Sequence, residues 1–506
     1  MPTDRLFFAC VVVLVACLLL GGGTRAGFLS DAVLQLAAIP LLLMAMGRLA
    51  DPGARGNARW PLMFCLALVL VPALQLVPLP PGVWTALPNR AELADTLRLL
   101  GPDLPWIPVS LSPRATWLSL LSLLPPLAVF LGTLLLSYRQ RRALSLVLLA
   151  VGLVSVFLGL VQVAEGPTSN LRFFEVTNST EAVGFFANRN HFAASLCALT
   201  MFAAAWAVEA SAPPAPLARE RGPFETRRIV SVVAGFTVLV ILVAAQAIAR
   251  SRAGLGLAIV ALLGGIGLAL RDRRNAGANV TPGRLLIAAT ALAVVFATQF
   301  SLYRLLERFE DDPLKDSRVT LARVTSEAAR LYMPLGSGVG TFVPVYAMHE
   351  RPEDAPLDAY ANRAHNDVLE LWLEGGVVGL GLGAAFLAWL VVRSLQVWRR
   401  TASGREIDLS LMRAATVLMA LIVAHSLVDY PLRTGAMMAI MAFACGLLVA
   451  PPPGEDGYEA VADRRGGVVA TARKGPAKVR RPADAPISQH PSERWGSDIE
   501  WPEDWR

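Results

Sequence analysis

Long apolar stretches separated by short polar segments run through most of the chain. One covers residues 6–21, and another, residues 230–249, contains no charged residue. Stretches of about 20 apolar residues match the ~30 Å hydrocarbon core of a bilayer. Many further stretches follow the first one, which also lacks a clear cleavage site, so we interpret it as a retained helix and not as a signal peptide. The pattern predicts an all-α, polytopic transmembrane bundle.

The apolar stretches predict twelve membrane-spanning helices within residues 1–450. We expect them near residues 6–21, 32–48, 61–77, 117–137, 143–163, 186–208, 229–249, 254–270, 285–303, 366–392, 413–430 and 433–450.

The arginines indicate the orientation of these helices. They concentrate in alternate loops, within residues 48–59, 139–142, 219–228, 271–284 and 393–405. Cytoplasmic loops of membrane proteins carry an excess of arginine and lysine, which is the positive-inside rule. The rule predicts here that both termini are cytoplasmic. The chain is 55% hydrophobic and 17% charged with a net charge of +7. We attribute this charge to topology, and we expect membrane lipid and no nucleic acid as a partner.

Two of the predicted outer loops are long. Residues 78–116 are rich in proline and carry Trp84 and Trp106, and Trp117 follows directly; these tryptophans suit the membrane interface. Residues 304–365 form the second, partly helical loop, with a helical stretch from Asp316 to Tyr332 and a glycine-rich turn at 336–340. Residues 451–506 lack apolar periodicity, and we expect a disordered cytoplasmic tail.

Two arginines lie on the side that should be poor in them. Arg250 and Arg252 flank Ser251 in a tight outer turn between two apolar helices. One interpretation is that they extend to lipid phosphates. The other is an anion site, because guanidinium is always charged and binds phosphate oxygens in a bidentate manner.

A second polar group precedes the sixth predicted helix. Asn188, Arg189, Asn190 and His191 cluster at its outer end. They fit either a polar cavity that binds substrate or an ordinary helix start, capped by Asn188, with interfacial charges. His191 alone favours a structural role.

The segment from Ala364 to Gly376 carries the strongest local signal. Asp367 and Glu370 share one helical face, and Asn366 or Asp367 can cap the helix. A cap does not require His365, and the positive end of a helix disfavours imidazolium. A neutral histidine there can act as a general base. Arg318, further upstream, alone indicates only a solvated loop charge.

Several motifs of nucleotide and metal enzymes are missing from the sequence. There is no Gly-x-x-x-x-Gly-Lys-Ser/Thr, no Gly-x-Gly-x-x-Gly after a strand and no His-Glu-x-x-His. We expect no cofactor and no metal. An outward-facing site also lacks cytoplasmic ATP, so a donor there must carry its own activation, as a lipid-linked sugar pyrophosphate does.

The order of the motifs resembles the O-antigen ligase/O-antigen polymerase superfamily over roughly residues 115–450. The motifs are Gly184–Asn190, Ser251–Gly254, Ser317-Arg318, Pro334–Phe342, His365–Glu370 with Glu374-Gly375-Gly376, and His425–Leu432. The resemblance implies a membrane glycosyltransferase-like bundle in the bacterial inner membrane, with a periplasmic active site.

The resemblance also implies a metal-independent, inverting glycosyl transfer from a polyprenyl-pyrophosphate-linked glycan, of undecaprenyl type, to an acceptor hydroxyl. His365 would position or deprotonate the hydroxyl, and Arg252 and Arg318 would hold the pyrophosphate. The substrate-binding candidates are Asn188, Arg189, Asn190, Arg250, Asn366, Asp367 and Glu370.

Alternatives remain open on the sequence alone. The acceptor is a growing glycan in a polymerase of exopolysaccharide or O-antigen, or the lipid A core of lipopolysaccharide in an O-antigen ligase. Chain-length regulators or export proteins are further candidate partners. A function of another class, a lipid-linked glycan flippase or secondary transporter, predicts paired broken helices and ionisable residues at the midplane, which the sequence does not show.

Overall fold

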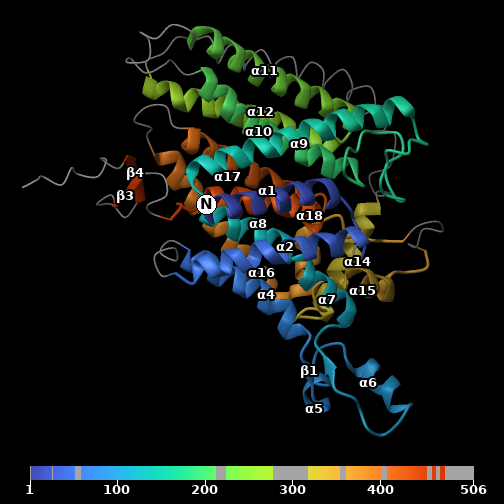
Figure 1. The fold of residues 1–506 in the computed structure, drawn as a ribbon. Helices are drawn as coiled ribbons and strands as arrows, with labels where there is room; N and C mark the ends of the chain where they lie inside the picture. The colour runs from blue at the N-terminus through green and yellow to red at the C-terminus, as the bar shows by residue number, and fades with distance from the viewer. Residues whose placement is uncertain are drawn as a thin grey trace, which may run out of the picture. The chain divides into compact units, whose positions relative to one another are not determined.

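The computed structural model describes residues 2–25, 27–51, 58–211, 224–276, 317–353, 360–400 and 407–452, and two strands beyond them. Two compact units divide the chain, Met1–Pro452 and Pro453–Arg506. The described part of the first unit is built almost entirely of helices (Figure 1).

The helices of the first unit are α1 (Pro2–Leu20), α2 (Leu29–Leu49), α4 (Arg59–Gln75), α5 (Pro81–Trp84), α6 (Ala91–Arg98), α7 (Pro113–Ser122), α8 (Leu124–Leu135), α9 (Tyr138–Glu165), α10 (Arg189–Ser211), α11 (Phe224–Ala249), α12 (Arg252–Ala276), α14 (Ser317–Leu331), α15 (Phe342–His349), α16 (Asp367–Arg399), α17 (Ile407–His425) and α18 (Gly435–Leu447). A 3-10 turn, η3 (Pro431–Arg433), precedes α18, and strands β1 (Pro78–Leu79) and β2 (Ile107–Pro108) pair antiparallel.

Eight stretches of helix in the described residues are long and apolar enough to cross a membrane: α2, α7 with α8, α9, α10, α11, α12, α16 and α17. The helices α4 and α18 are apolar but shorter, and α1 is apolar from Leu6 onward. The predicted helix at 285–303 lies outside the described residues. The structure therefore confirms a helical membrane protein, while twelve spans and the side on which each loop lies stay predictions.

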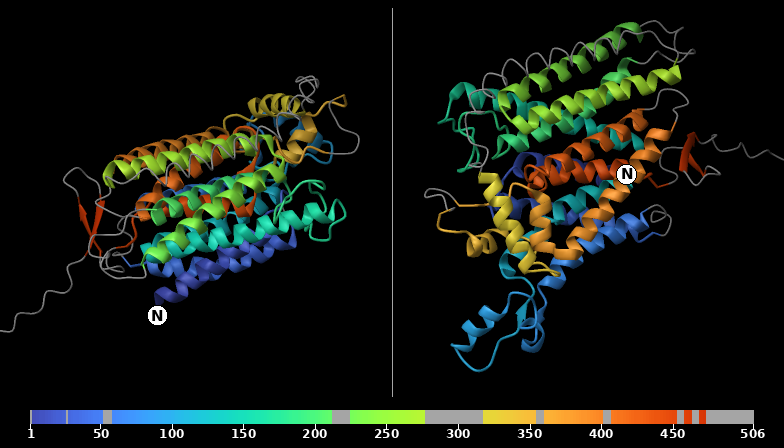
Figure 2. Two further views of the ribbon diagram at one scale, coloured as in Figure 1. Left: turned by 90° about the horizontal axis from the view of Figure 1, so that it is seen from above. Right: turned by 180° about the vertical axis from the view of Figure 1, so that it is seen from behind.

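The helix α10 is the most buried of the candidate spans, with 94% of its apolar window inside the protein. It packs against α11, α12 and α17, which lie beside it (Figure 2). Small side chains make this possible, because the buried face of α10 is rich in alanine and lets neighbouring backbones approach closely. A second group, α1, α2, α8 and α18, packs together in the same core.

Helix ends differ from the predicted ranges where a local residue forces a turn. The stretch predicted as helical over 413–430 begins earlier, at Ile407, and ends at His425. Pro431 lacks a backbone N–H and disfavours helical backbone in the residue before it, so a helix cannot continue through this region. As a result Asp429 and Tyr430 lie in the turn between α17 and η3 and not in a helix.

The glycine-rich turn fixes the segment after α14 against α16. Gly336 and Gly376 both have positive φ, and a Cβ on either would meet backbone atoms of the other segment at 2.5 Å or less. The side chain of Gln75 bridges them, since its Nε2 donates to Glu374 O at 3.0 Å and its Oε1 accepts from Val339 N at 2.9 Å. The two helices α14 and α15 of the predicted 304–365 loop are thereby held beside the start of α16.

The predicted interfacial tryptophans fall into two groups. Trp84 is fully buried, and its Nε1 donates to Pro105 O at 2.9 Å. It therefore packs inside the 78–112 segment and does not face lipid. Trp106 and Trp117 are exposed, as a membrane-interface position requires.

The second unit contains a short antiparallel hairpin of β3 (Tyr458–Ala462) and β4 (Val468–Ala472). The sequence predicts no regular structure after Pro451, and these strands depart from that expectation. The rest of this tail after Pro452 lies outside the described residues.

Candidate functional site

Asp429 is the centre of a buried polar cluster. Its Oδ1 lies 3.2 Å from His365 Nδ1 and accepts from Tyr430 N at 2.9 Å, and its Oδ2 accepts from Asn190 Nδ2 at 2.6 Å. Burial raises the pKa of the Asp429 carboxyl, but the contact with His365 and the neighbouring imidazoles outweigh burial and hold that pKa below its ordinary value. Asp429 is therefore a carboxylate at neutral pH.

Three histidines surround this carboxylate, and only one of the three is accessible. His191 and His425 are fully buried, each with Nε2 3.9 Å from an Asp429 oxygen. The Tyr430 ring contacts both His191 and His365, at a centroid distance of 4.8 Å in each pair and with the rings nearly perpendicular. The side chain of His365 is 26% exposed. His365 is thus the histidine of this group that can meet a substrate.

The backbone at His365 has an unusual conformation. Its φ is +53°, in the left-handed region that non-glycine residues rarely adopt. The next residue, Asn366, caps α16, because its Oδ1 accepts from Val368 N at 2.9 Å and Leu369 N at 3.1 Å. The capping role predicted for Asn366 as one option is confirmed.

A chain of hydrogen bonds joins this centre to the arginine turn between α11 and α12. Ser251 Oγ donates to Asn190 Oδ1 at 2.8 Å, and the same amide group donates to Asp429. Ser251 Oγ also accepts from Gly254 N at 3.0 Å, which fixes the start of α12. Arg250, with φ +50°, and Arg252 flank this serine, and both are exposed.

Arg318 belongs to the same region of the protein. It lies in the first turn of α14 and is exposed, and α14 packs against α16. Residues far apart in the sequence therefore converge here, because the starts of α10, α12, α14 and α16 and the end of α17 come together.

The other residues of the α10 start have partners within the protein. Asn188 Oδ1 accepts from Asn190 N at 2.8 Å, and the Asn188 side chain hydrogen-bonds to Tyr430. Arg189 forms an ion pair with Glu181. Asn188 and Asn190 thus join the cluster around Asp429, whereas the charge of Arg189 is balanced outside it.

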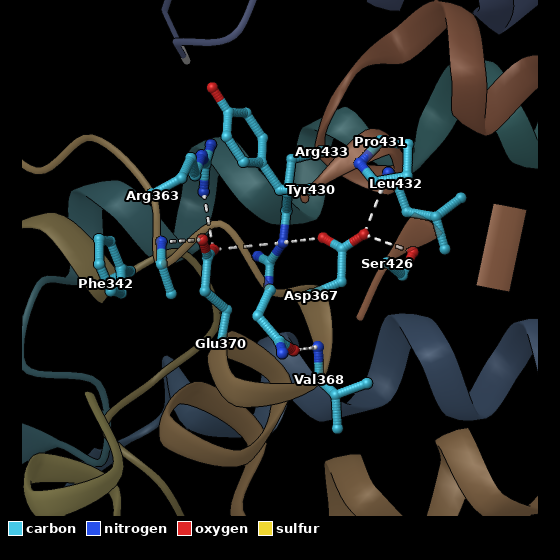
Figure 3. A network of polar contacts seen from close by, with 12 residues as sticks. Phe342, Arg363, Asp367, Val368, Glu370, Ser426, Tyr430, Pro431, Leu432 and Arg433 are labelled. Carbon is cyan, nitrogen blue, oxygen red and sulfur yellow. Dashed lines mark hydrogen bonds and ion pairs between the residues drawn. The ribbon is translucent and has the colours of Figure 1, made fainter. Parts of the chain in front are cut away.

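The acidic face of α16 forms a second cluster around Arg433 (Figure 3). Arg433 Nη1 lies 2.8 Å from Glu374 Oε2, and Arg433 Nε lies 3.4 Å from both Asp367 Oδ1 and Glu370 Oε2. Burial lowers the pKa of the Arg433 guanidinium, but the three carboxylates outweigh it and raise that pKa above its ordinary value. Asp367 and Glu370, predicted to bind substrate, are engaged in contacts within the protein.

Sequence reasoning selected His365, Arg252 and Arg318 but did not select Asp429, His425, Tyr430 or Arg433 as site residues. The segment His425–Leu432 was recognised only as part of the family pattern. A signal was present, since Asp429 is an ionisable residue directly beside an apolar helix, where charge is costly and usually functional.

The described residues contain no group of three or more His, Cys, Asp or Glu side chains arranged to hold a metal ion.

Comparisons of the chain with known proteins gave a match to a family model. None of the curated proteins compared with the chain matches it. Residues 236–384 match the family model described as O-antigen ligase, a segment that includes Arg252, Arg318 and His365. This match confirms the predicted resemblance to the O-antigen ligase superfamily over residues 236–384.

Proposed function

We propose that the chain transfers glycan from a polyprenyl-pyrophosphate donor to an acceptor hydroxyl at the periplasmic face of a bacterial inner membrane. The family match supports a role in surface polysaccharide assembly and a glycosyltransferase-like activity in general. The observation that carries the finer proposal is the 3.2 Å contact between His365 and the buried Asp429 carboxylate. A partly exposed imidazole backed by a carboxylate is suited to take a proton from a hydroxyl.

The transfer is a single displacement at the anomeric carbon of the donor. The acceptor oxygen attacks the anomeric carbon from the face opposite the leaving group, and a new glycosidic C–O bond forms with inversion. The bond between the anomeric carbon and the phosphate oxygen breaks, and the polyprenyl pyrophosphate leaves with the electron pair. The hydroxyl proton passes to His365, and Asp429 stabilises the imidazolium that forms because opposite charges at this distance attract.

In this mechanism, Arg252 and Arg318 stabilise the leaving pyrophosphate. Negative charge builds up on the pyrophosphate as the bond breaks, and fixed positive groups that meet this charge lower the barrier. Arg252 and Arg318 are exposed and lie at helix starts beside the cluster. Guanidinium suits this role because it binds phosphate oxygens through two N–H groups at once.

The acceptor distinguishes the two branches of this function. A growing glycan repeat as acceptor makes the protein a polymerase, and the lipid A core as acceptor makes it a ligase. A deletion strain with single-repeat products indicates a polymerase. Uncapped lipid core beside polymer that stays on its carrier indicates a ligase.

A deletion strain also tests the chemistry. We expect lipid-linked glycan to accumulate and the wild-type gene to restore the surface polysaccharide, whereas His365→Ala, Arg252→Ala and Arg318→Ala do not restore it. His349→Ala is the matched control, because His349 lies in α15 and contacts Tyr332 at 3.3 Å, outside the cluster. Full rescue by all three variants would contradict the mechanism. Glycan crossing the membrane without bond formation would favour a flippase instead.

A further inference from the structure

The backbone on both sides of His365 is held by hydrogen bonds. Before it, Ala364 N donates to Glu370 Oε1 at 2.8 Å. After it, Asp367 N donates to Ser426 O at 2.9 Å, and Asn366 Nδ2 donates to Leu427 O at 2.8 Å. A residue with φ +53° needs such restraints, because an unfavourable backbone conformation persists only where its surroundings determine it.

The restraint before His365 depends on the Glu370 carboxylate staying in place. Glu370 is fully buried, and its neighbours on the same helical face are the carboxylates of Asp367 and Glu374. Three carboxylates on one buried face repel one another, and a buried charge without a partner is strongly destabilising. Arg363 also contacts Glu370, at 3.3 Å. It belongs, however, to the same segment as Ala364 and His365, so it cannot anchor that segment from outside.

Arg433 is the cation that all three carboxylates share. From η3, the turn that follows Asp429 and Tyr430, it reaches Asp367 and Glu370 (Figure 3). It also contacts Glu374. The same short segment thus contacts the imidazole of His365 through Asp429 and holds the backbone of His365 through Arg433 and Glu370. A shift of this segment moves both restraints together.

We propose that Arg433 is a positioning residue, which fixes the backbone of His365 in its strained conformation through the buried Glu370 carboxylate. Asp367 and Glu370 then serve the geometry of the base and do not bind substrate. The inference rests on the proposed function for its kinetic consequences, but its structural consequence can be measured without any reaction.

The test compares Arg433→Met with Arg142→Met in the full-length protein in nanodiscs. Arg142 is the matched control because it also loses a partly buried ion pair, here with Asp408 through Nε at 2.7 Å, between α9 and the start of α17. Its partner Asp408 lies in the first turn of α17, at the opposite end of that helix from His425. The readouts are amide hydrogen exchange over residues 360–370, the thermal unfolding midpoint, and kcat and KM for glycan transfer.

We expect exchange at residues 363–365 to be faster by about tenfold or more in Arg433→Met and unchanged in Arg142→Met. We expect kcat to fall by about 10²-fold with KM for the donor within about twofold, because a displaced base slows the chemical step and leaves binding intact. Arg433→Lys keeps the charge but not the forked geometry, and we expect an intermediate kcat.

A double-mutant cycle with Glu370→Gln separates positioning from general stability. If the two residues act through one contact, the double variant loses less kcat than the product of the single losses. Unchanged exchange at residues 363–365 in Arg433→Met overturns the inference, and so does a loss equal to that of Arg142→Met in all readouts. Absence of transfer in the wild type, with faster exchange in Arg433→Met, sinks the proposed function and retains the positioning role.

Discussion

The two polar clusters near the start of α16 differ in composition, one with histidines around a carboxylate and the other with carboxylates around an arginine, and in how their groups are engaged. Around Asp429, the imidazole of His365 is partly exposed, and the two buried histidines lie 3.9 Å from the carboxylate. Around Arg433, each carboxylate has a cation or hydrogen-bond donor within 3.4 Å. A reactive residue is therefore identified by an accessible side chain that contacts a buried partner, and not by the number of charged groups around it.

The comparison predicts the largest loss for the accessible imidazole. We expect His365→Ala to lower kcat by about 10²- to 10⁴-fold, the usual contribution of a general base. The unfolding midpoint should stay close to that of the wild type, because a partly exposed side chain is removed. Purified protein in nanodiscs with a lipid-linked donor gives both numbers, and a variant with wild-type kcat would remove His365 from the chemistry.

Asp429→Asn should have the next largest effect. The amide keeps the shape of the side chain but no longer stabilises imidazolium, and we expect kcat to fall by about 10²-fold with little change in KM. Glu374→Gln in the other cluster provides the contrast, because it touches Arg433 and not His365. A larger kcat loss in Glu374→Gln than in Asp429→Asn would reverse the roles of the two clusters.

The exposed arginines Arg252 and Arg318 should contribute to binding of the donor pyrophosphate, whereas Arg433 should not. We expect Arg252→Ala and Arg318→Ala each to lower kcat/KM for the donor by about 10- to 10²-fold, since each removes a charged hydrogen-bond donor. Inorganic pyrophosphate should inhibit the wild type more strongly than either variant. Equal inhibition of all three proteins would show that these arginines do not hold the diphosphate.

The smallest effect should come from Arg189. Its charge is paired with Glu181, outside the contacts that reach Asp429, and we expect Arg189→Gln to change kcat/KM by less than about twofold. Asn190→Ala, one residue away, loses the bonds to both Asp429 and Ser251 and should cost about tenfold. If the two variants behave alike, the hydrogen-bond chain through Asn190 has no catalytic role.

The sequence predicted the helices well because apolar length is a local signal. Every predicted range that falls on described residues overlaps a helix. Local departures occur at a proline or a glycine, as where α17 ends before Pro431 and where α16 kinks at Gly376. The site was predicted only in part. His365 stood out because a helix cap does not explain a histidine, but its partner Asp429 is 64 residues away and Arg433 is further still. Such contacts depend on how helix ends meet, which no local pattern contains.

Glycosidic bond formation by the purified protein tests the central claim most directly. Wild type, His365→Ala and the His349→Ala control are incubated with a lipid-linked glycan donor and an acceptor, without nucleotide or added metal, and the products are separated by mass. We predict a product one glycan larger than the acceptor, with release of polyprenyl pyrophosphate, from the wild type and His349→Ala but not from His365→Ala. Equal product from His365→Ala, or donor moved across the bilayer with no new bond in any of the three proteins, would contradict the account.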